Sequence, residues 1–344
     1  VITAIGLREA IIRSIPDAVK TAITPGIGLF ITIIGLKNAG IVISNPATLV
    51  SLVDFSQWKI EGADLALMSS ALVALAGLVI MGMLHARKVK GSILLGIVAA
   101  TLIGIPLGVT HISNLDMNIG MKFRDFAEVS FMKMDFAGLF SGANMVETIF
   151  TVTMLVISFS LVNMFDSIGT LLGAAKQSGM IDENGEVIRM KQALMSDAIS
   201  TAAGAMVGTS TVTTVVESSA GIAAGGRTGL TSLVTALMFL GAILFAPIVS
   251  IVPAAATAPA LIFVGILMLG NIRDVDFSDM SNALPAFCTI VFMPFTYSIA
   301  NGVAFGLITY CLMKLTTGRR QDVKILTLAI SVVFVVRYAF MTLG

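Results

Sequence analysis

Apolar runs of about twenty residues recur along most of this chain, each bounded by a short polar or basic loop. A helix needs about 20 apolar residues to cross a bilayer. Charged residues make up 12% of the sequence, against about 25% in soluble domains. The runs that predict membrane-spanning helices are 18–36, 63–84, 91–110, 146–175, 230–252, 254–271, 283–299 and 301–315. We therefore predict an all-α polytopic membrane protein, with a further short helix at 192–207 and an apolar run at 323–342 that can either span or lie on the surface.

The net charge, the cysteines and the histidines give no reason to expect nucleic-acid binding or a metal site. The net charge is +1, which gives no reason to expect a nucleic acid partner. Cys288 and Cys311 lie in apolar runs and are expected to be packing residues. His85 and His111 are far apart in the sequence, so we expect no metal site, and nothing suggests a cofactor.

One segment, from Gly208 to Gly229, breaks the apolar pattern with the sequence GTSTVTTVVESSAGIAAGGRTG. Residues 209–216 are Ser, Thr and Val only, and β-branched residues favour extended backbone. Residues 217–226 begin with Glu217 and small residues, which favour a first helical turn, and end in a Gly pair. A broken membrane segment with an ionisable residue at the break indicates a transporter's binding site. The alternative is a polar loop outside the membrane with an incidental glutamate.

Two carboxylates fall inside apolar surroundings, Glu217 at the break and Asp166 within the run 146–175. An aspartate at the centre of a membrane helix costs roughly 2.5–3.5 kcal/mol on insertion scales, so such groups usually bind a ligand or move protons. Asn163, Asp166 and Thr170 are spaced to share one helix face, which predicts an inward polar stripe. The alternative is that neighbouring Ser, Thr or Asn side chains satisfy each carboxylate and that the two only fix helix packing.

Three other charged residues are interpreted as structural. Asp197 and Glu147 lie near the ends of predicted spans, where a solvated or capping role is expected. Arg227 follows the Gly pair, where a cation suits a helix C-terminus or a lipid head group.

The connecting segments also carry predictions. The segment 37–62 is expected to be a polar loop with Trp58 as an interface anchor. The segment 111–145 fits a helix lying in the interface or a loop packed over the protein. Pro285 and Pro294 are expected to bend or split the span 283–299.

Several stretches resemble the nucleobase:cation symporter-2 family, and within it the purine permeases. They are FDSIGTLLGAAKQSG, GTSTVTTVVESSAGIAAGGRTG, TAPALIFVG, PFTYSIANG and AITPGIGLFITIIGLKNAGIV. The resemblance extends along the whole chain. It implies an inverted-repeat (7+7) transporter fold in which a core domain faces a gate domain and two broken helices carry short half-strands.

On that resemblance, the first three family segments and most of the fourth are absent from this sequence, and with them the partner half-strand. The resemblance also implies how the chain is divided. Residues 1–16 would be the end of a core helix with a basic loop, and residues 17–145 would be gate-domain helices with an extracellular loop. The core domain would be 146–252 with the broken helix at 209–225, followed by further gate-domain helices at 253–317 and a C-terminal apolar segment at 318–344.

The resemblance also implies a function, namely proton-coupled uptake of hypoxanthine, guanine or adenine through the cell membrane, and no enzymatic activity. Asp166 and Glu217 match the carboxylate positions that contact the base and couple protons. Thr170 assists the first carboxylate, Val216 offers its backbone to the base, and Ser218 and Asn163 complete the expected binding set. The implied partners are a purine, a proton or a sodium ion and the lipid bilayer, and a homodimer is compatible with them.

Three rival functions remain at this stage. A uracil or xanthine carrier of the same family usually has Glu where this chain has Asp166. An anion transporter of the same fold predicts a cation at the half-helix N-terminus, where this chain has Glu217. A membrane-embedded hydrolase would need a nucleophile with a base or a metal cluster, and the sequence carries no such motif.

Overall fold

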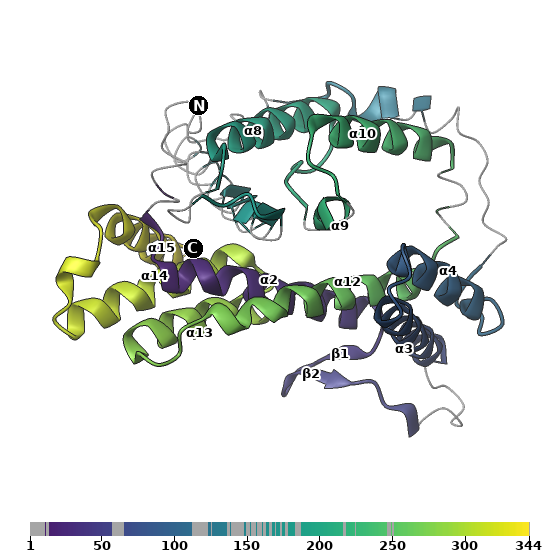
Figure 1. Ribbon diagram of the computed structural model, residues 1–344, viewed down its shortest axis with the longest axis horizontal. Helices are drawn as coiled ribbons and strands as arrows, with labels where there is room; N and C mark the ends of the chain where they lie inside the picture. Colours follow the sequence, from purple (N-terminus) through teal and green to yellow (C-terminus); the bar gives the residue numbers. More distant parts are fainter. Residues whose placement is uncertain are drawn as a thin grey trace. The chain divides into compact units, whose positions relative to one another are not determined.

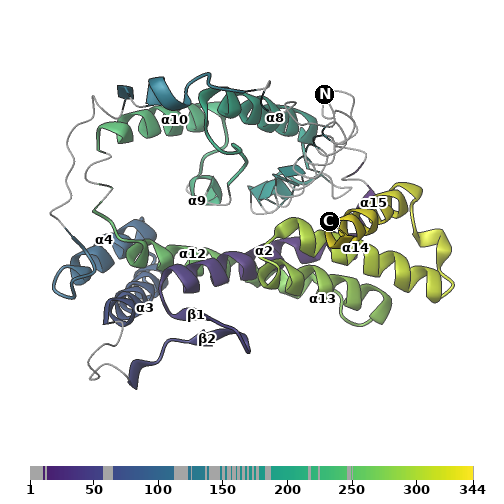
Figure 2. The same cartoon turned by 180° about the vertical axis from the view of Figure 1, so that it is seen from behind.

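The computed structural model is mainly helical over the residues that it describes (Figures 1 and 2). The described residues are 11, 14–56, 65–111, 123–124, 126–135, 138, 148, 152, 156, 160, 163–164, 167–168, 170–172, 174–175, 178–182, 187–215, 218–223, 225–245, 249 and 251–343.

The chain divides into two compact units, and each is described by itself. The first unit comprises Val1–Ile27, Gly120–Arg227 and Asn271–Gly344, and the second comprises Gly28–Ile119 and Thr228–Gly270. Helix α2 (Asp17–Asn38) belongs to both units, because the division falls within it. The core and gate boundaries predicted above remain a prediction.

The second unit is built around helix α3 (Leu65–Ala86), which packs against α4 (Ser92–Gly104) and α12 (Ala254–Leu269). The three helices lie together in both ribbon views (Figures 1 and 2). Small buried side chains let the backbones approach closely, as is usual between membrane helices. They include Val73, Ala100, Ala255 and Ala256.

A β-hairpin occupies part of the segment predicted as a polar loop at 37–62, so that prediction was incomplete. Strands β1 (Val42–Asn45) and β2 (Leu49–Leu52) pair antiparallel. Asn45 Oδ1 accepts hydrogen bonds from the backbone N–H groups of Ala47 and Thr48, at 2.8 and 3.3 Å. Such an Asx turn supplies the reversal that closes the hairpin.

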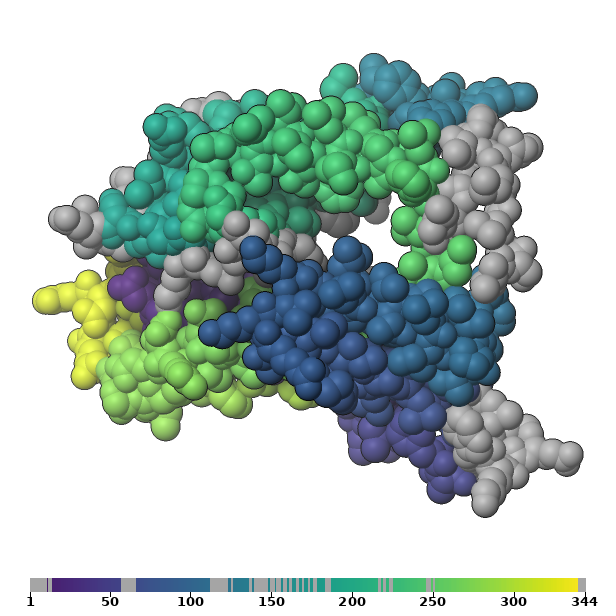
Figure 3. Space-filling view, turned by 45° about the vertical axis from the view of Figure 1, so that its right-hand side comes forward, coloured from purple at the N-terminus to yellow at the C-terminus, as the bar shows by residue number. Residues whose placement is uncertain are grey.

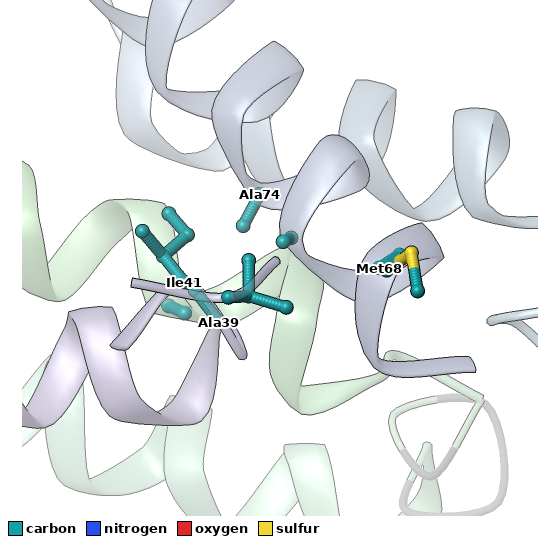
Figure 4. Close-up of a cluster of buried hydrophobic side chains, with 7 residues drawn as sticks. Ala39, Ile41, Met68 and Ala74 are labelled. Atoms are coloured by element: carbon teal, nitrogen blue, oxygen red, sulfur yellow. The ribbon is translucent and has the colours of Figure 1, made fainter. Parts of the chain in front are cut away.

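The chain on either side of the hairpin packs onto α3. Figure 4 shows Ala39 and Ile41 in one apolar cluster with Met68 and Ala74 of α3, and all four side chains are buried. The hairpin is therefore anchored at its base by apolar contacts.

Helix α10 (Gly229–Leu244) has no buried residue, and its apolar side chains lie at the surface (green in Figure 3). Leu230, Met238 and Phe239 are 66%, 70% and 72% exposed. Exposed apolar surface of this extent is expected of a helix that contacts lipid.

The first unit contains α13 (Met280–Phe295), α14 (Ile299–Thr316) and α15 (Ile325–Leu343), packed in sequence. The span 283–299 is split at only one of the two prolines where a bend or split was predicted. Helix α13 continues past Pro285 and ends directly after Pro294. Ser298 then caps α14 by accepting from the N–H of Asn301 at 3.3 Å. The turn therefore falls at 296–298, where the proline ends the first helix and the serine begins the second.

Four helices among the described residues are long and apolar enough to cross a membrane. They are Asp17–Asn38, Ala66–Ala86, Ala254–Asp274 and Ile299–Thr316, the third including the 3₁₀ turn η4 (Gly270–Asp274). Shorter apolar helices add Ser92–Gly104, Gly229–Leu244, Met280–Phe295 and Ile325–Ala339. A short 3₁₀ helix, η5 (Arg320–Asp322), joins α14 to α15. Both cysteines are free and buried, as expected of packing residues.

Candidate functional site

The segment predicted to be broken is interrupted in the structure. Helix α8 (Met190–Val207) ends at Gly208, whose φ of 84° is left-handed, and residues 209–215 are neither helix nor strand. A short helix, α9 (Ser218–Ala223), follows. The Ser, Thr and Val run therefore does leave the helical conformation, although it forms no strand pairing among the described residues.

Gly208 lies against a second element that was not predicted to touch it. A Cβ added at Gly208 would meet the backbone of Ser130, at the end of the π-helix η3 (Phe126–Ser130). The N–H of Met132 donates to the carbonyl of Met206 at 3.0 Å. The segment around 126–132 is therefore held against the end of α8, next to the break.

Asp197 is the centre of the polar contacts around the break. Its side chain is 7% exposed. The Ser167 hydroxyl lies 2.9 Å from Oδ1 and 2.8 Å from Oδ2 of Asp197. The interpretation of Asp197 as a solvated or capping residue is therefore wrong, because the carboxylate faces inward from the middle of α8 and is hydrogen-bonded there.

Two threonines of the non-helical segment join the same network. Ser167 Oγ lies 3.0 Å from Thr213 Oγ1, and Thr214 Oγ1 lies 3.5 Å from Asp197 Oδ1. On the far side, the Thr201 hydroxyl donates to the carbonyl of Val212 at 2.7 Å. The broken segment is thus tied both to α8 and to the helical residues around Ser167. These hydroxyl contacts hold the three elements in register.

The predicted polar stripe is partly within the described residues. Residues 163–164, 167–168 and 170–172 are helical. Thr170 is 5% exposed and donates to the carbonyl of Ser167 at 3.1 Å. Asn163 Oδ1 is buried and accepts no hydrogen bond from the residues that the structure describes. Asn163, Ser167 and Thr170 share one face by their spacing, so Ser167 is a member of the stripe that sequence reasoning missed.

Three predicted site residues lie outside the described residues, namely Asp166, Val216 and Glu217. Ser218 is described, and it is the exposed first residue of α9. The prediction that Asp166 and Glu217 face one cavity therefore remains a prediction. Glu147 also lies outside the described residues.

Arg227 has the structural role predicted for it. Its guanidinium donates to the carbonyl of Ile222, and to that of Gly226 at 2.9 Å. These are carbonyls at and beyond the end of α9, where a cation is favourable. No group of three His, Cys, Asp or Glu side chains that could hold a metal occurs among the described residues.

Comparison with known proteins connects this geometry to a family. A Permease family model matches residues 1–305 of the chain. The adenine permease AdeP of Escherichia coli K12 is 39% identical over 339 residues, which cover 98% of this chain and 71% of that protein. The adenine permease AdeQ of the same organism is 38% identical over 341 residues, covering 98% and 70%. The guanine/hypoxanthine permease PbuO of Bacillus subtilis 168 is 36% identical over 342 residues, covering 96% and 72%.

These matches confirm the family resemblance and, with the apolar helices, the prediction of a multi-pass membrane protein. The relatives carry the names of transporters rather than enzymes. The chain therefore belongs to the Permease family.

Proposed function

We propose that this protein is a secondary active transporter that takes up purine nucleobases, such as hypoxanthine, guanine and adenine, through the cell membrane by proton-coupled alternating access. The observation that carries the proposal is the hydrogen-bonded junction of Ser167, Asp197 and Thr213. It fixes a non-helical segment against the helix whose polar face is turned inward. The names of the relatives supply the substrate class.

The chemistry of a purine suits the residues expected at this junction. A purine is a flat ring that carries N–H donors on its edge. Glu217 would accept from ring or exocyclic N–H groups, and the Val216 backbone and the Ser218 hydroxyl would lie beside it. From the neighbouring helix, Asp166, Thr170 and Asn163 would complete the binding set. Hydrogen bonds to a charged acceptor contribute about 1.5–3 kcal/mol each, so two carboxylates suffice to select a donor-bearing ring.

Coupling requires a carboxylate that can take up and release a proton during the cycle. Asp166 is proposed for that role, and the roles of Asp166 and Glu217 can be exchanged. Burial disfavours the charged form of a carboxylate, which brings protonation within reach of neutral pH. Movement of a core domain past a gate domain would then expose the site to each side in turn.

The site assignment is tested by measuring uptake of labelled hypoxanthine in cells that express Glu217→Gln or Asp166→Asn. Each substitution keeps the shape of the side chain and removes its charge. We expect at least a tenfold loss in each case, the effect of about 1.4 kcal/mol. Glu128→Gln is the control. Glu128 forms an exposed ion pair with Arg124 at 2.8 Å, so the variant protein should transport at the wild-type rate. Wild-type rates in both site variants would reject the assignment.

The coupling ion and the substrate class are separate outcomes of the same assay. A protonophore should abolish uptake, whereas replacement of external sodium by potassium should not. If the sodium replacement stops uptake instead, sodium is the coupling ion. Competition by unlabelled adenine and guanine, with little effect of uracil and xanthine, is expected of a purine permease. The reverse order of competition would favour the uracil and xanthine carriers.

A further inference from the structure

Asn163 differs from the other described members of the polar stripe in one respect. The hydroxyls of Ser167 and Thr170 are both hydrogen-bonded. Asn163 Oδ1 is buried and receives no hydrogen bond from the described residues. A buried amide oxygen without a donor is uncommon in folded proteins and lowers stability.

The position of this oxygen would let a bound ligand donate a hydrogen bond to it. Asn163 lies one helical turn before Ser167, whose hydroxyl bridges to Asp197 and Thr213. The unsatisfied acceptor is therefore on the same helix face as the junction that holds the broken segment. A ligand bound at that junction would bring its N–H groups to this face.

We propose that Asn163 is a specificity-determining residue, whose Oδ1 accepts a hydrogen bond from the exocyclic amino group of the transported base. This inference rests on the proposed function. With the carboxylates of Asp166 and Glu217, the amide oxygen would give the site three acceptors. Such a site favours bases that carry an amino group, guanine and adenine, over otherwise similar bases that lack one, hypoxanthine and unsubstituted purine. A base without the amino group leaves the acceptor unpaired, which is the strongest way in which a polar site rejects an analogue.

The experiment compares two pairs of bases that differ by one amino group, guanine with hypoxanthine and adenine with purine. Binding of each base to the full chain, purified and reconstituted in lipid nanodiscs, is measured for the wild type and for Asn163→Leu. In at least one pair the wild type should bind the amino base about tenfold more tightly. In Asn163→Leu that ratio should fall to near one. Asn163→Asp, which keeps an acceptor at the same place, should retain most of the preference.

A matched control is available at Asn301, the same residue type with its oxygen already occupied. The Tyr338 hydroxyl donates to Asn301 Oδ1 at 2.9 Å. Asn301→Leu should lower the unfolding temperature, because it removes the hydrogen bond between Tyr338 and Asn301, and it should leave the base ratio unchanged. Asn163→Leu should unfold at or above the wild-type temperature, because it removes a polar atom that has no partner.

Two results overturn the role of Asn163. One is a wild type that binds the members of both pairs equally. The other is an Asn163→Leu protein that binds bases with the wild-type ratio. A lower unfolding temperature for Asn163→Leu, together with an unchanged ratio, would show that the amide is structural. If the wild type binds none of the four bases, the proposed function itself is wrong, and this inference falls with it.

Discussion

The Ser167 hydroxyl lies within 2.9 Å of both carboxylate oxygens of Asp197, although the two residues are 30 positions apart in the sequence. Both side chains are buried. The same hydroxyl is 3.0 Å from Thr213 Oγ1, on the non-helical segment. One serine thus connects a helix that carries a candidate transport residue to the broken segment that carries the other.

Ser167→Ala should destabilise the protein, because it removes a hydrogen bond from a buried carboxylate. A hydrogen bond to a charged group contributes about 1.5–3 kcal/mol. The free energy of unfolding, measured in detergent, should fall by about that amount, and hypoxanthine uptake should fall with it. Thr235→Ala is the control, since Thr235 is exposed and its hydroxyl donates to the backbone carbonyl of Thr231 in its own helix at 2.8 Å. Equal stability of Ser167→Ala and the control would show that the Ser167 bond contributes nothing.

Gly265→Ala should also destabilise the protein, because α12 lies against α2 at this position. A Cβ at Gly265 would lie 2.6 Å from the carbonyl oxygen of Gly28 and would clash with the Thr32 hydroxyl. Overpacking of this kind typically costs about 1–3 kcal/mol. Gly241→Ala, in α10 with no described atom within 4 Å of its Cβ position, should instead be neutral or gain about 0.5–1 kcal/mol. Thermal unfolding of both variants gives the comparison, and similar losses in the two would contradict the close approach of the helices.

Removing the charge of Lys314 should change the protein's stability less than removing the charge of Asp322. The Lys314 side chain is 4% exposed and its Nζ lies 3.6 Å from Asp322 Oδ2, whereas Asp322 is 51% exposed. Lys314→Met removes a buried charge and leaves a carboxylate that water can solvate, so the change should stay within about 1 kcal/mol. Asp322→Asn leaves the buried ammonium with the Ser281 hydroxyl, 2.9 Å away, as its described neutral acceptor. Asp322→Asn should therefore unfold more readily, and the opposite order would contradict this reasoning.

Stability should depend on acid pH through Asp279, the cap of α13. The N–H of Ser281 donates to this carboxylate at 2.9 Å, and the Ser281 hydroxyl and Arg319 add further bonds. Together these bonds lower the pKa of Asp279 to about 2. Because the folded pKa lies below the ordinary value of 3.8, the stabilisation is complete above that value and is lost as the pH falls toward 2.

Asp279→Asn tests the effect of this carboxylate. Its unfolding temperature should be below that of the wild type at pH 5, and the gap should narrow as the pH approaches 2. A gap of constant size across this range would show that the ionised form of Asp279 does not stabilise the fold.

Much of the helical architecture could be predicted from the sequence, because the signal is local. The run 18–36 became α2 and the run 63–84 became α3, each within two residues. The hairpin at 42–52 was missed, since its strands are only four residues long and alternate weakly between polar and apolar positions. The span predicted from the run 91–110 is also longer than α4, which ends at Gly104.

The sequence by itself determined that this is a membrane protein of apolar helices, interrupted after Gly208 by residues that favour extended backbone. Both properties depend on side chains within a few positions of each other. Only the tertiary structure decided that Asp197 is buried, that Ser167 bonds to it and that Thr213 lies against Ser167, because those contacts join residues 30 and 46 positions apart. The position of Asp197 near the end of a predicted span suggested solvent, but the packing of α8 against two distant segments buries the carboxylate and brings the hydroxyls of Ser167 and Thr214 to it.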